Sequence, residues 1–279
     1  MPGSDAFEDH ADATLERVSV LAPPGALERL HVLAHALRVL KPGGVLDVMA
    51  PKARGGARLA KELAGFGVGG ESEARAHHRR MIAVRPAEVQ GLAGTIARTG
   101  PQRVPVLGLI SQPGVFSWDR IDPGSLMLAR HLAGPGGQDA LAGRGADLGC
   151  GIGHLAIEAL RSPQIAALRL IDIDRRAIAC ARANIKDARA LIEWADVRAL
   201  PEADLDFVIS NPPFHAAGEQ SHGLGQMFLE KAALMLRRGG RALIVANRHL
   251  PYERTLSAHF SRVSTLEEGA GYKVIEAVK

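Results

Sequence analysis

From residue 145 to the end of the chain, short apolar runs alternate with helical patterns. The runs cover residues 145–149, 168–172, 205–210, 242–247 and 272–278, and the helical patterns lie between them at 153–161, 175–186, 224–236 and 251–259. Strands that alternate with helices form βαβ units and a mainly parallel sheet with helices on both faces. The alternation therefore predicts an α/β fold with a doubly wound, mainly parallel sheet. The last run alternates polar and apolar residues, which fits an antiparallel edge strand.

The first hundred residues predict a smaller α/β domain. Its expected elements are helices at 26–40 and 57–65 and strands at 45–50 and 80–84. Between Glu88 and Pro113 the periodicity weakens, and glycines and prolines accumulate. We place the connection between two domains there, which gives a first domain over residues 1–103 and a second over residues 104–279.

One internal similarity links the two expected domains. Residues Ala36–Ala50 parallel Ala232–Ala246, because both segments read as the end of a helix, a Gly-Gly pair and a strand. Two interpretations stay open: a duplicated domain, or a local arrangement that recurs in many α/β proteins. The first copy has neither a glycine-rich loop nor an Asn-Pro-Pro segment, so a catalytic role is expected of the second domain only.

Composition limits the remaining possibilities. The chain has 279 residues and a formal net charge of +4, which is compatible with a polyanionic partner but does not require one. The acidic, polar start lacks the apolar segment expected of a signal peptide, and no run reaches the roughly 20 apolar residues that span a bilayer. Two cysteines exclude a disulfide framework, and no cluster has zinc-ligand spacing. We expect a cytoplasmic protein without a metal or a membrane partner.

A glycine-rich loop, Ala146-Asp-Leu-Gly-Cys-Gly-Ile-Gly153, follows the first strand of the second domain. Gly149, Gly151 and Gly153 permit a tight turn and a close approach of the backbone to a ligand. A dinucleotide loop has different spacing, and Asp147 would repel a diphosphate but suits a ligand with an ammonium and a sulfonium. The segment resembles motif I of the class I methyltransferases and indicates S-adenosylmethionine as the cofactor.

Two further carboxylates fit that cofactor. Asp172 ends the next strand, where an acidic residue binds ribose hydroxyls in nucleotide-binding α/β folds. Asp174 is expected to cap the following helix. Asp196 lies near the end of the third strand and either receives the adenine amino group or is a simple loop carboxylate. Cys150 is interpreted as a small packed residue and not as a nucleophile.

The most informative segment is Leu205-Asp-Phe-Val-Ile-Ser-Asn-Pro-Pro-Phe214, a buried strand that runs into Asn211, Pro212, Pro213 and Phe214. An exocyclic or amide nitrogen is a poor nucleophile because its lone pair is delocalised. The side-chain oxygen of Asn211 and the carbonyl of Pro212 can each hold one N–H and aim the lone pair at a methyl group. Phe214 would stack on the planar substrate. These four residues are the predicted catalytic group for methylation of an amino nitrogen.

Several linked motifs resemble the bacterial ribosomal RNA guanine-N2 methyltransferases, from about residue 104 to the end of the chain. The motifs are Gly114-Val-Phe-Ser-Trp-Asp-Arg-Ile-Asp-Pro-Gly-Ser125, the glycine loop, Ser210-Asn-Pro-Pro-Phe-His215, Val245-Ala-Asn-Arg-His-Leu-Pro-Tyr252 and Gly271-Tyr-Lys-Val-Ile-Glu-Ala. The resemblance implies ribosomal RNA or a ribosomal subunit as the partner. It also implies a first domain that is a degenerate duplicate of the catalytic one.

The same resemblance implies roles for individual residues. Phe116 and Ser125 would line the cofactor or substrate cleft, and His215 would contact the substrate. Asn247 and Arg248 would touch the target base or a nearby phosphate. For Phe116, Ser125, Asn247 and Arg248 a purely structural role is the alternative.

Three other functions stay open at this point. A glutamine-N5 methyltransferase of release factors shares the Asn-Pro-Pro-aromatic segment, and an adenine-N6 methyltransferase is a second enzyme alternative. A catalytically inactive RNA-binding protein would have the same fold, although the intact Asp147, glycines and Asn211 argue against it.

Overall fold

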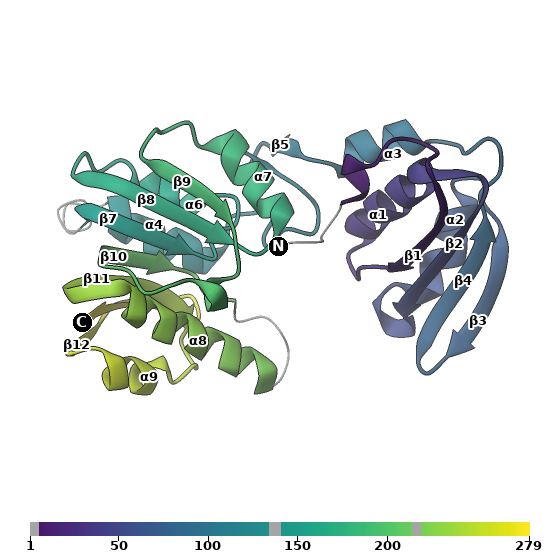
Figure 1. Ribbon diagram of the computed structural model, residues 1–279. Helices are drawn as coiled ribbons and strands as arrows, with labels where there is room; N and C mark the ends of the chain where they lie inside the picture. Colours follow the sequence, from purple (N-terminus) through teal and green to yellow (C-terminus); the bar gives the residue numbers. More distant parts are fainter. Residues whose placement is uncertain (1–5, 134–140, 214–218) are drawn as a thin grey trace. The chain divides into compact units, whose positions relative to one another are not determined.

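The computed structural model describes residues 6–133, 141–213 and 219–279 and divides the chain into two compact units (Figure 1). The first unit comprises residues 1–102 and 112–114, and the second comprises residues 103–111 and 115–279.

A seven-stranded sheet forms the centre of the second unit, in the order β12-β13-β11-β10-β7-β8-β9. Its strands are β7 (Gly143–Leu148), β8 (Ile165–Asp172), β9 (Ala190–Trp194), β10 (Leu205–Ser210), β11 (Leu236–Asn247), β12 (Arg262–Gly269) and β13 (Tyr272–Val278). Strands β7 to β11 pair in parallel, whereas β13 is antiparallel to both β11 and β12. The doubly wound sheet is confirmed. The antiparallel last strand is also confirmed, but the edge position is wrong, because the polar strand β12 lies outside it.

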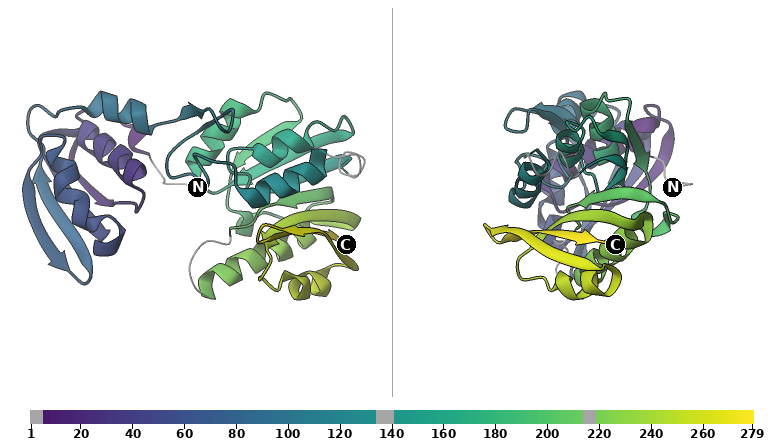
Figure 2. Two further views of the ribbon diagram at one scale, coloured as in Figure 1. Left: turned by 180° about the vertical axis from the view of Figure 1, so that it is seen from behind. Right: turned by 90° about the vertical axis from the view of Figure 1, so that its left-hand side faces the viewer.

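Helices cover both faces of this sheet (Figures 1 and 2). One apolar cluster joins α8 (Glu219–Met235) and α9 (Tyr252–His259) to one face, and a second joins α4 (Pro123–Ala133), α6 (His154–Ala159) and α7 (Arg175–Asn184) to the other. Strand residues alternate between the clusters: Val208 belongs to the first, and Phe207 and Ile209 belong to the second. This alternation is the period of two that a strand buried on both faces requires. A short helix, η4 (Val197–Ala199), follows β9, and the small strands β5 (Gln102–Val104) and β6 (Leu109–Ser111) form a separate two-stranded sheet.

The first unit contains a four-stranded sheet in the order β1-β2-β4-β3. Its elements are β1 (Leu15–Leu21), β2 (Leu40–Pro51), β3 (Gly70–Arg75), β4 (His78–Val84), α1 (Ala26–Val39), α2 (Leu59–Ala64), α3 (Leu92–Thr99), and the short helices η1 (Phe7–Asp9), η2 (Lys52–Arg54) and η3 (Gly56–Arg58). Both predicted helices and both predicted strands are present. The connection expected from Glu88 onward instead begins with α3, whose Leu92 and Ile96 pack on the apolar cluster of this unit.

The sheet of the first unit repeats the β10-β11-β13-β12 half of the second sheet. The parallel pair β1–β2 shifts register between Leu15 and Arg17, and the parallel pair β10–β11 shifts register between Leu205 and Phe207. The longer strand of each pair has a glycine with a left-handed backbone at its fourth residue: Gly43 in β2 has φ 81° and Gly239 in β11 has φ 75°. The similarity therefore extends to strand order, register and turn geometry. The part of the first unit that the structure describes contains no counterpart of β7, β8 and β9.

Candidate active site

The glycine loop connects β7 to α6 in left-handed conformations, with φ 72° at Gly149, 54° at Gly151 and 89° at Gly153. A Cβ atom on Gly153 would lie 2.6 Å from Cδ1 of Ile185, so that position also requires close packing. The loop is fastened to β8: Gly149 N donates to the Ile171 carbonyl at 2.8 Å, and Gly151 N donates to Oδ2 of Asp172 at 2.8 Å. Glycine is needed here because side chains rarely adopt this backbone conformation.

A cavity of about 460 Å³ opens beside this loop. Gly149 and Gly151, the carboxylates Asp172 and Asp196, and Asn211 with the two prolines that follow it all contribute to its lining. The cavity lies at the carboxyl ends of β7, β8 and β10, where the strand order reverses and open α/β sheets bind ligands. Its volume lies within the range of roughly 300–1,000 Å³ typical of small-molecule sites.

Asp172 and Asp196 both reach the cavity, as the sequence predicts. Asp172 is partly buried, and burial is the main reason why its pKa is raised. Asp196 accepts from the Arg198 backbone N–H and pairs with the Arg198 guanidinium, which lowers the pKa of Asp196. Asp174 lies on the same cavity wall and caps α7 by accepting from Arg176 N, which confirms the predicted cap. The assigned contacts with ribose and adenine stay predictions.

Asp147 differs from the expectation of a carboxylate that meets the cofactor directly. Its side chain is fully buried and lines neither described cavity. Among the described residues neither carboxylate oxygen has a partner with good hydrogen-bond geometry, although the backbone N–H of Ala156 lies near enough to lower the pKa of Asp147 slightly. Burial, followed by repulsion from Asp172, raises the pKa of Asp147 to about 8. Cys150 is buried as predicted, and burial raises the pKa of its thiol well above the usual range, which makes a nucleophilic role unfavourable.

Asn211 follows β10 and lies between the large cavity and an adjoining one of about 70 Å³. Its Nδ2 donates to Asp122 Oδ2 at 2.9 Å and to Ser125 Oγ at 2.8 Å. The hydroxyl of Tyr272 donates to Asp122 Oδ1 at 3.4 Å, and the backbone N–H of Ser125 donates to Asp122 Oδ2 at 2.7 Å. Asp122 and Tyr272 were not among the predicted site residues. The Asp-Pro pair before α4 is a helix-start signal that would have identified Asp122.

The remaining predicted site residues have different placements. Phe116 is 53% exposed and lines both cavities. Phe214 and His215 lie outside the described residues. Asn247 ends β11, and Arg248 is exposed on the loop that follows, but neither lines the cavities. Their contact with a base or a phosphate stays a prediction.

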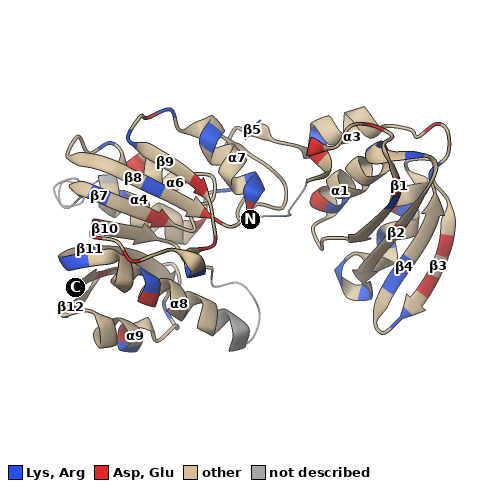
Figure 3. Cartoon of the chain, in the orientation of Figure 1, with Lys and Arg blue, Asp and Glu red and all other residues tan. Residues whose placement is uncertain are grey.

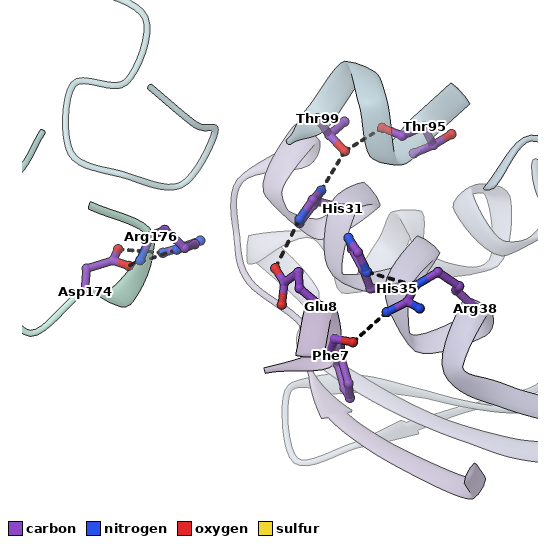
Figure 4. A network of polar contacts seen from close by, with 9 residues as sticks. All are labelled: Phe7, Glu8, His31, His35, Arg38, Thr95, Thr99, Asp174 and Arg176. Carbon is purple, nitrogen blue, oxygen red and sulfur yellow. Dashed lines mark hydrogen bonds and ion pairs between the residues drawn. The ribbon is translucent and has the colours of Figure 1, made fainter. Parts of the chain in front are cut away.

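A second polar cluster lies in the first unit, where Glu8, His31 and His35 bring possible metal-ligand atoms within 4.8 Å of one another (Figure 4). Arg38 Nε donates to His35 Nδ1 at 3.3 Å. Because burial lowers the pKa of His35 to about 4, its ring is neutral near pH 7, and its proton must then reside on Nε2. The ring of His31 hydrogen-bonds to Glu8 Oε1 at 3.3 Å, and Arg38 Nη2 donates to the Phe7 carbonyl at 2.6 Å, so the contacts that the structure shows form a polar link between η1 and α1.

Comparison with known proteins identifies the family. The family model described as "Methyltransferase small domain" matches residues 106–276. The chain belongs to this methyltransferase family. The part that matches the family contains every described residue that lines the cavity and all of the seven-stranded sheet except the last two residues of β13. No described helix is both long enough and apolar enough to cross a membrane.

Relatives of this methyltransferase extend over nearly the whole chain. The "Ribosomal RNA small subunit methyltransferase C" of Pseudomonas paraeruginosa is 31% identical and aligns with 99% of this chain and 83% of the relative. The protein of that name from Stutzerimonas stutzeri is 32% identical and aligns with 94% of this chain and 79% of the relative. The structure of the T. thermophilus 16S rRNA N2 G1207 methyltransferase (RsmC), in complex with AdoMet and guanosine, has a TM-score of 0.81 and 28% identity, and it covers 98% of this chain and 75% of that one.

Proposed function

We propose that this methyltransferase transfers a methyl group from S-adenosylmethionine to the exocyclic N2 amine of a guanine in small-subunit ribosomal RNA. One observation is central: Asn211 and Pro212 directly follow a buried strand and line a cavity that the glycine loop, Asp172 and Asp196 also line. This combination fits the donor, because loop backbone and carboxylates can hold its adenosine and amino-acid parts. The names of the relatives support ribosomal RNA as the acceptor.

The geometry supports a mechanism based on positioning. Bound S-adenosylmethionine supplies an electrophilic methyl group on a sulfonium. The Oδ1 atom of Asn211 and the carbonyl of Pro212 accept the two N–H groups of the guanine amine, which draws the nitrogen toward a tetrahedral geometry and directs its lone pair at the cavity. The fixed acceptors also stabilise the positive charge that develops on the nitrogen. The surplus proton leaves after transfer, so no general base is required.

The enzyme alternatives have less support. The similar proteins and the similar structure quoted above are named for ribosomal RNA, and the guanosine in the T. thermophilus structure favours a guanine acceptor over adenine or glutamine. An RNA substrate of this kind places the enzyme with ribosomal subunits in the cytoplasm.

We also infer that the first unit is a degenerate duplicate that binds the RNA. The repeated β10-β11-β13-β12 topology supports the duplication. Five cations support RNA binding, and together they define the basic patch: Lys52 and Arg54 of η2, Arg58 of η3, and Arg75 and Arg79 on either side of the β3–β4 turn. Lys and Arg segments are visible around that turn in Figure 3. The Lys52 N–H donates to the His77 carbonyl at 2.9 Å, which holds η2 against that turn. No ion pair of these five is found in the described residues, so their charge is available to phosphates.

The test is methyl transfer with labelled donor to 16S ribosomal RNA and to small ribosomal subunits that lack the modification. Nucleoside digestion and mass spectrometry should detect N2-methylguanosine with the wild type and at least about 100-fold less with Asn211→Ala, because one of the two acceptors is lost. Label on a release factor, or N6-methyladenosine in the RNA, would contradict the proposal.

A further inference from the structure

The amide of Asn211 has its two N–H donors engaged inside the protein. Nδ2 donates to a carboxylate oxygen of Asp122 and to the hydroxyl oxygen of Ser125, at 2.9 and 2.8 Å. A primary amide has two N–H donors and one carbonyl oxygen. With both donors directed at the start of α4, Oδ1 is the atom of this side chain that is left to accept an N–H from a ligand in the cavity.

Asp122 is itself held firmly. It is only 7% exposed, and its Oδ2 also accepts the backbone N–H of Ser125, which caps α4. Its Oδ1 accepts from the hydroxyl of Tyr272, at the start of β13. Gly124 permits this approach, because a Cβ atom there would lie 2.6 Å from the Tyr272 ring. The acceptors around Asn211 are therefore fixed by two separate elements, α4 and β13.

We propose that Asp122 and Ser125 are positioning residues that set the orientation of the Asn211 amide and so decide that it presents an acceptor to the substrate amine. This inference rests on the proposed function. A flipped amide would present N–H groups to the N–H groups of the substrate and would lose the hydrogen bond that aligns the lone pair. A side-chain amide that turns freely would present the correct atom for only part of the time, which lowers the turnover number without removing the binding site.

If Asp122 and Ser125 position Asn211, substituting them should lower kcat without weakening the binding of RNA or of S-adenosylmethionine. Ser125→Ala removes one acceptor but keeps the backbone cap, and we expect a kcat about 10-fold lower, with KM for RNA and the dissociation constant of S-adenosylmethionine within about 2-fold of wild type. Asp122→Ala removes the other acceptor and should lower kcat at least as far. Asp122→Asn keeps an oxygen for both donors and can turn its NH₂ toward the Tyr272 hydroxyl, so it should restore most of the activity.

Controls separate this role from general stability. Ser162→Ala deletes a buried hydroxyl that donates to the Leu141 carbonyl away from the cavity, and it should leave kcat unchanged. All variants are assayed with methyl transfer to ribosomal RNA, calorimetric titration of S-adenosylmethionine and thermal unfolding. A Ser125→Ala enzyme with wild-type kcat, or an Asp122→Asn enzyme as slow as Asp122→Ala, would overturn the inference. Failure of the wild type itself to form N2-methylguanosine would instead reject the proposed function.

Discussion

The carboxyl group of Asp147 lies near the end of β7 with no well-formed hydrogen bond among the described residues, and burial raises its pKa to about 8. In the unfolded chain the pKa is about 4. Between these values the folded protein keeps a proton that the unfolded chain has released. The free energy of unfolding therefore falls as the pH rises from about 4 to 8.

Asp147→Asn should remove this dependence in the protein without donor. The free energy of unfolding of the wild type should fall between pH 5 and pH 8, whereas that of the variant should not. The variant should therefore gain about 1–3 kcal/mol of stability relative to the wild type over this range. Urea unfolding followed by tryptophan fluorescence measures it, because Trp118 and Trp194 both belong to the second unit.

Asp187→Asn is the matched control. Hydrogen bonds from Arg189 lower the pKa of Asp187 to about 2, so its contribution is lost only as the pH falls through that region. The difference in unfolding free energy between Asp187→Asn and the wild type should therefore stay constant from pH 5 to pH 8. A constant difference for Asp147→Asn as well would show that Asp147 is ionised when folded.

At the scale of single elements, sequence patterns predicted those helices and strands whose apolar periodicity is strong. Helix α1 and strand β10 were predicted within a residue of their bounds. Among the missed elements, β3 is exposed along its whole length, and the amino end of α4 is set by an Asp-Pro cap more than by periodicity. Helix α3 is amphipathic, but it is short and lies among glycines and prolines that predict a connection. Local periodicity reports only the burial of an element, so it cannot reveal strands at exposed edges.

In the candidate site, too, the sequence predicted the features that local patterns encode and missed the contacts between distant residues. Glycines at special backbone positions and the Asn-Pro-Pro segment can be recognised from local sequence, and the structure places both at one cavity. The bonds from Asn211 to Asp122 and from Asp122 to Tyr272 join residues 89 and 150 positions apart. No local pattern encodes contacts at that separation, and the burial of Asp147 likewise depends on the completed fold.

Helix α1 carries an acid-sensitive group, because burial lowers the pKa of His35 to about 4. The unfolded chain then binds a proton near pH 6.5 that the folded unit does not bind. The contribution of His35 to the free energy of unfolding is therefore fully present above pH 6.5 and is lost as the pH falls toward 4. His35→Gln should reduce this loss. The chain has no Trp or Tyr in the first unit, so hydrogen exchange of α1 at pH 7 and pH 5 is the suitable measurement.

Wild-type α1 should lose more protection between these two pH values than α1 of the variant, after correction for the intrinsic exchange rates. His249→Gln, on an exposed loop of the second unit, should behave as the wild type does. Equal losses in wild type and His35→Gln would mean that His35 titrates as it does in the unfolded chain.

At the scale of the whole molecule, catalysis and RNA binding are assigned to different units. Arg54→Glu with Arg75→Glu, in the basic patch, should weaken binding of ribosomal RNA at least about 10-fold and flatten its salt dependence by roughly two phosphate contacts. The affinity for S-adenosylmethionine should not change. Filter binding across a range of salt concentrations measures both effects.

The comparison pair is Arg161→Glu with Arg238→Glu, which alters the net charge by the same amount. Both residues are exposed at the edge of the second sheet opposite the cavity: Arg161 precedes β8, and Arg238 lies near the start of β11. Arg161 also pairs with Glu158 at 3.0 Å, so thermal unfolding of this pair is measured alongside binding. This pair should retain most of the affinity. If the two pairs weaken binding equally, the RNA responds to total charge, and the first unit has no dedicated role.

The proposed duplication has a consequence for the two sheets. Register places Arg17, Asp47 and Arg80 of the first unit where the second unit has Phe207, Leu243 and Val274. The three apolar residues are buried beneath helices, whereas the three charged ones form ion pairs on the sheet face away from the apolar cluster. A single charge beneath a covering helix would cost several kcal/mol. If one ancestor gave rise to both units, the helix was therefore lost first, and the charges arrived on a face already open to water.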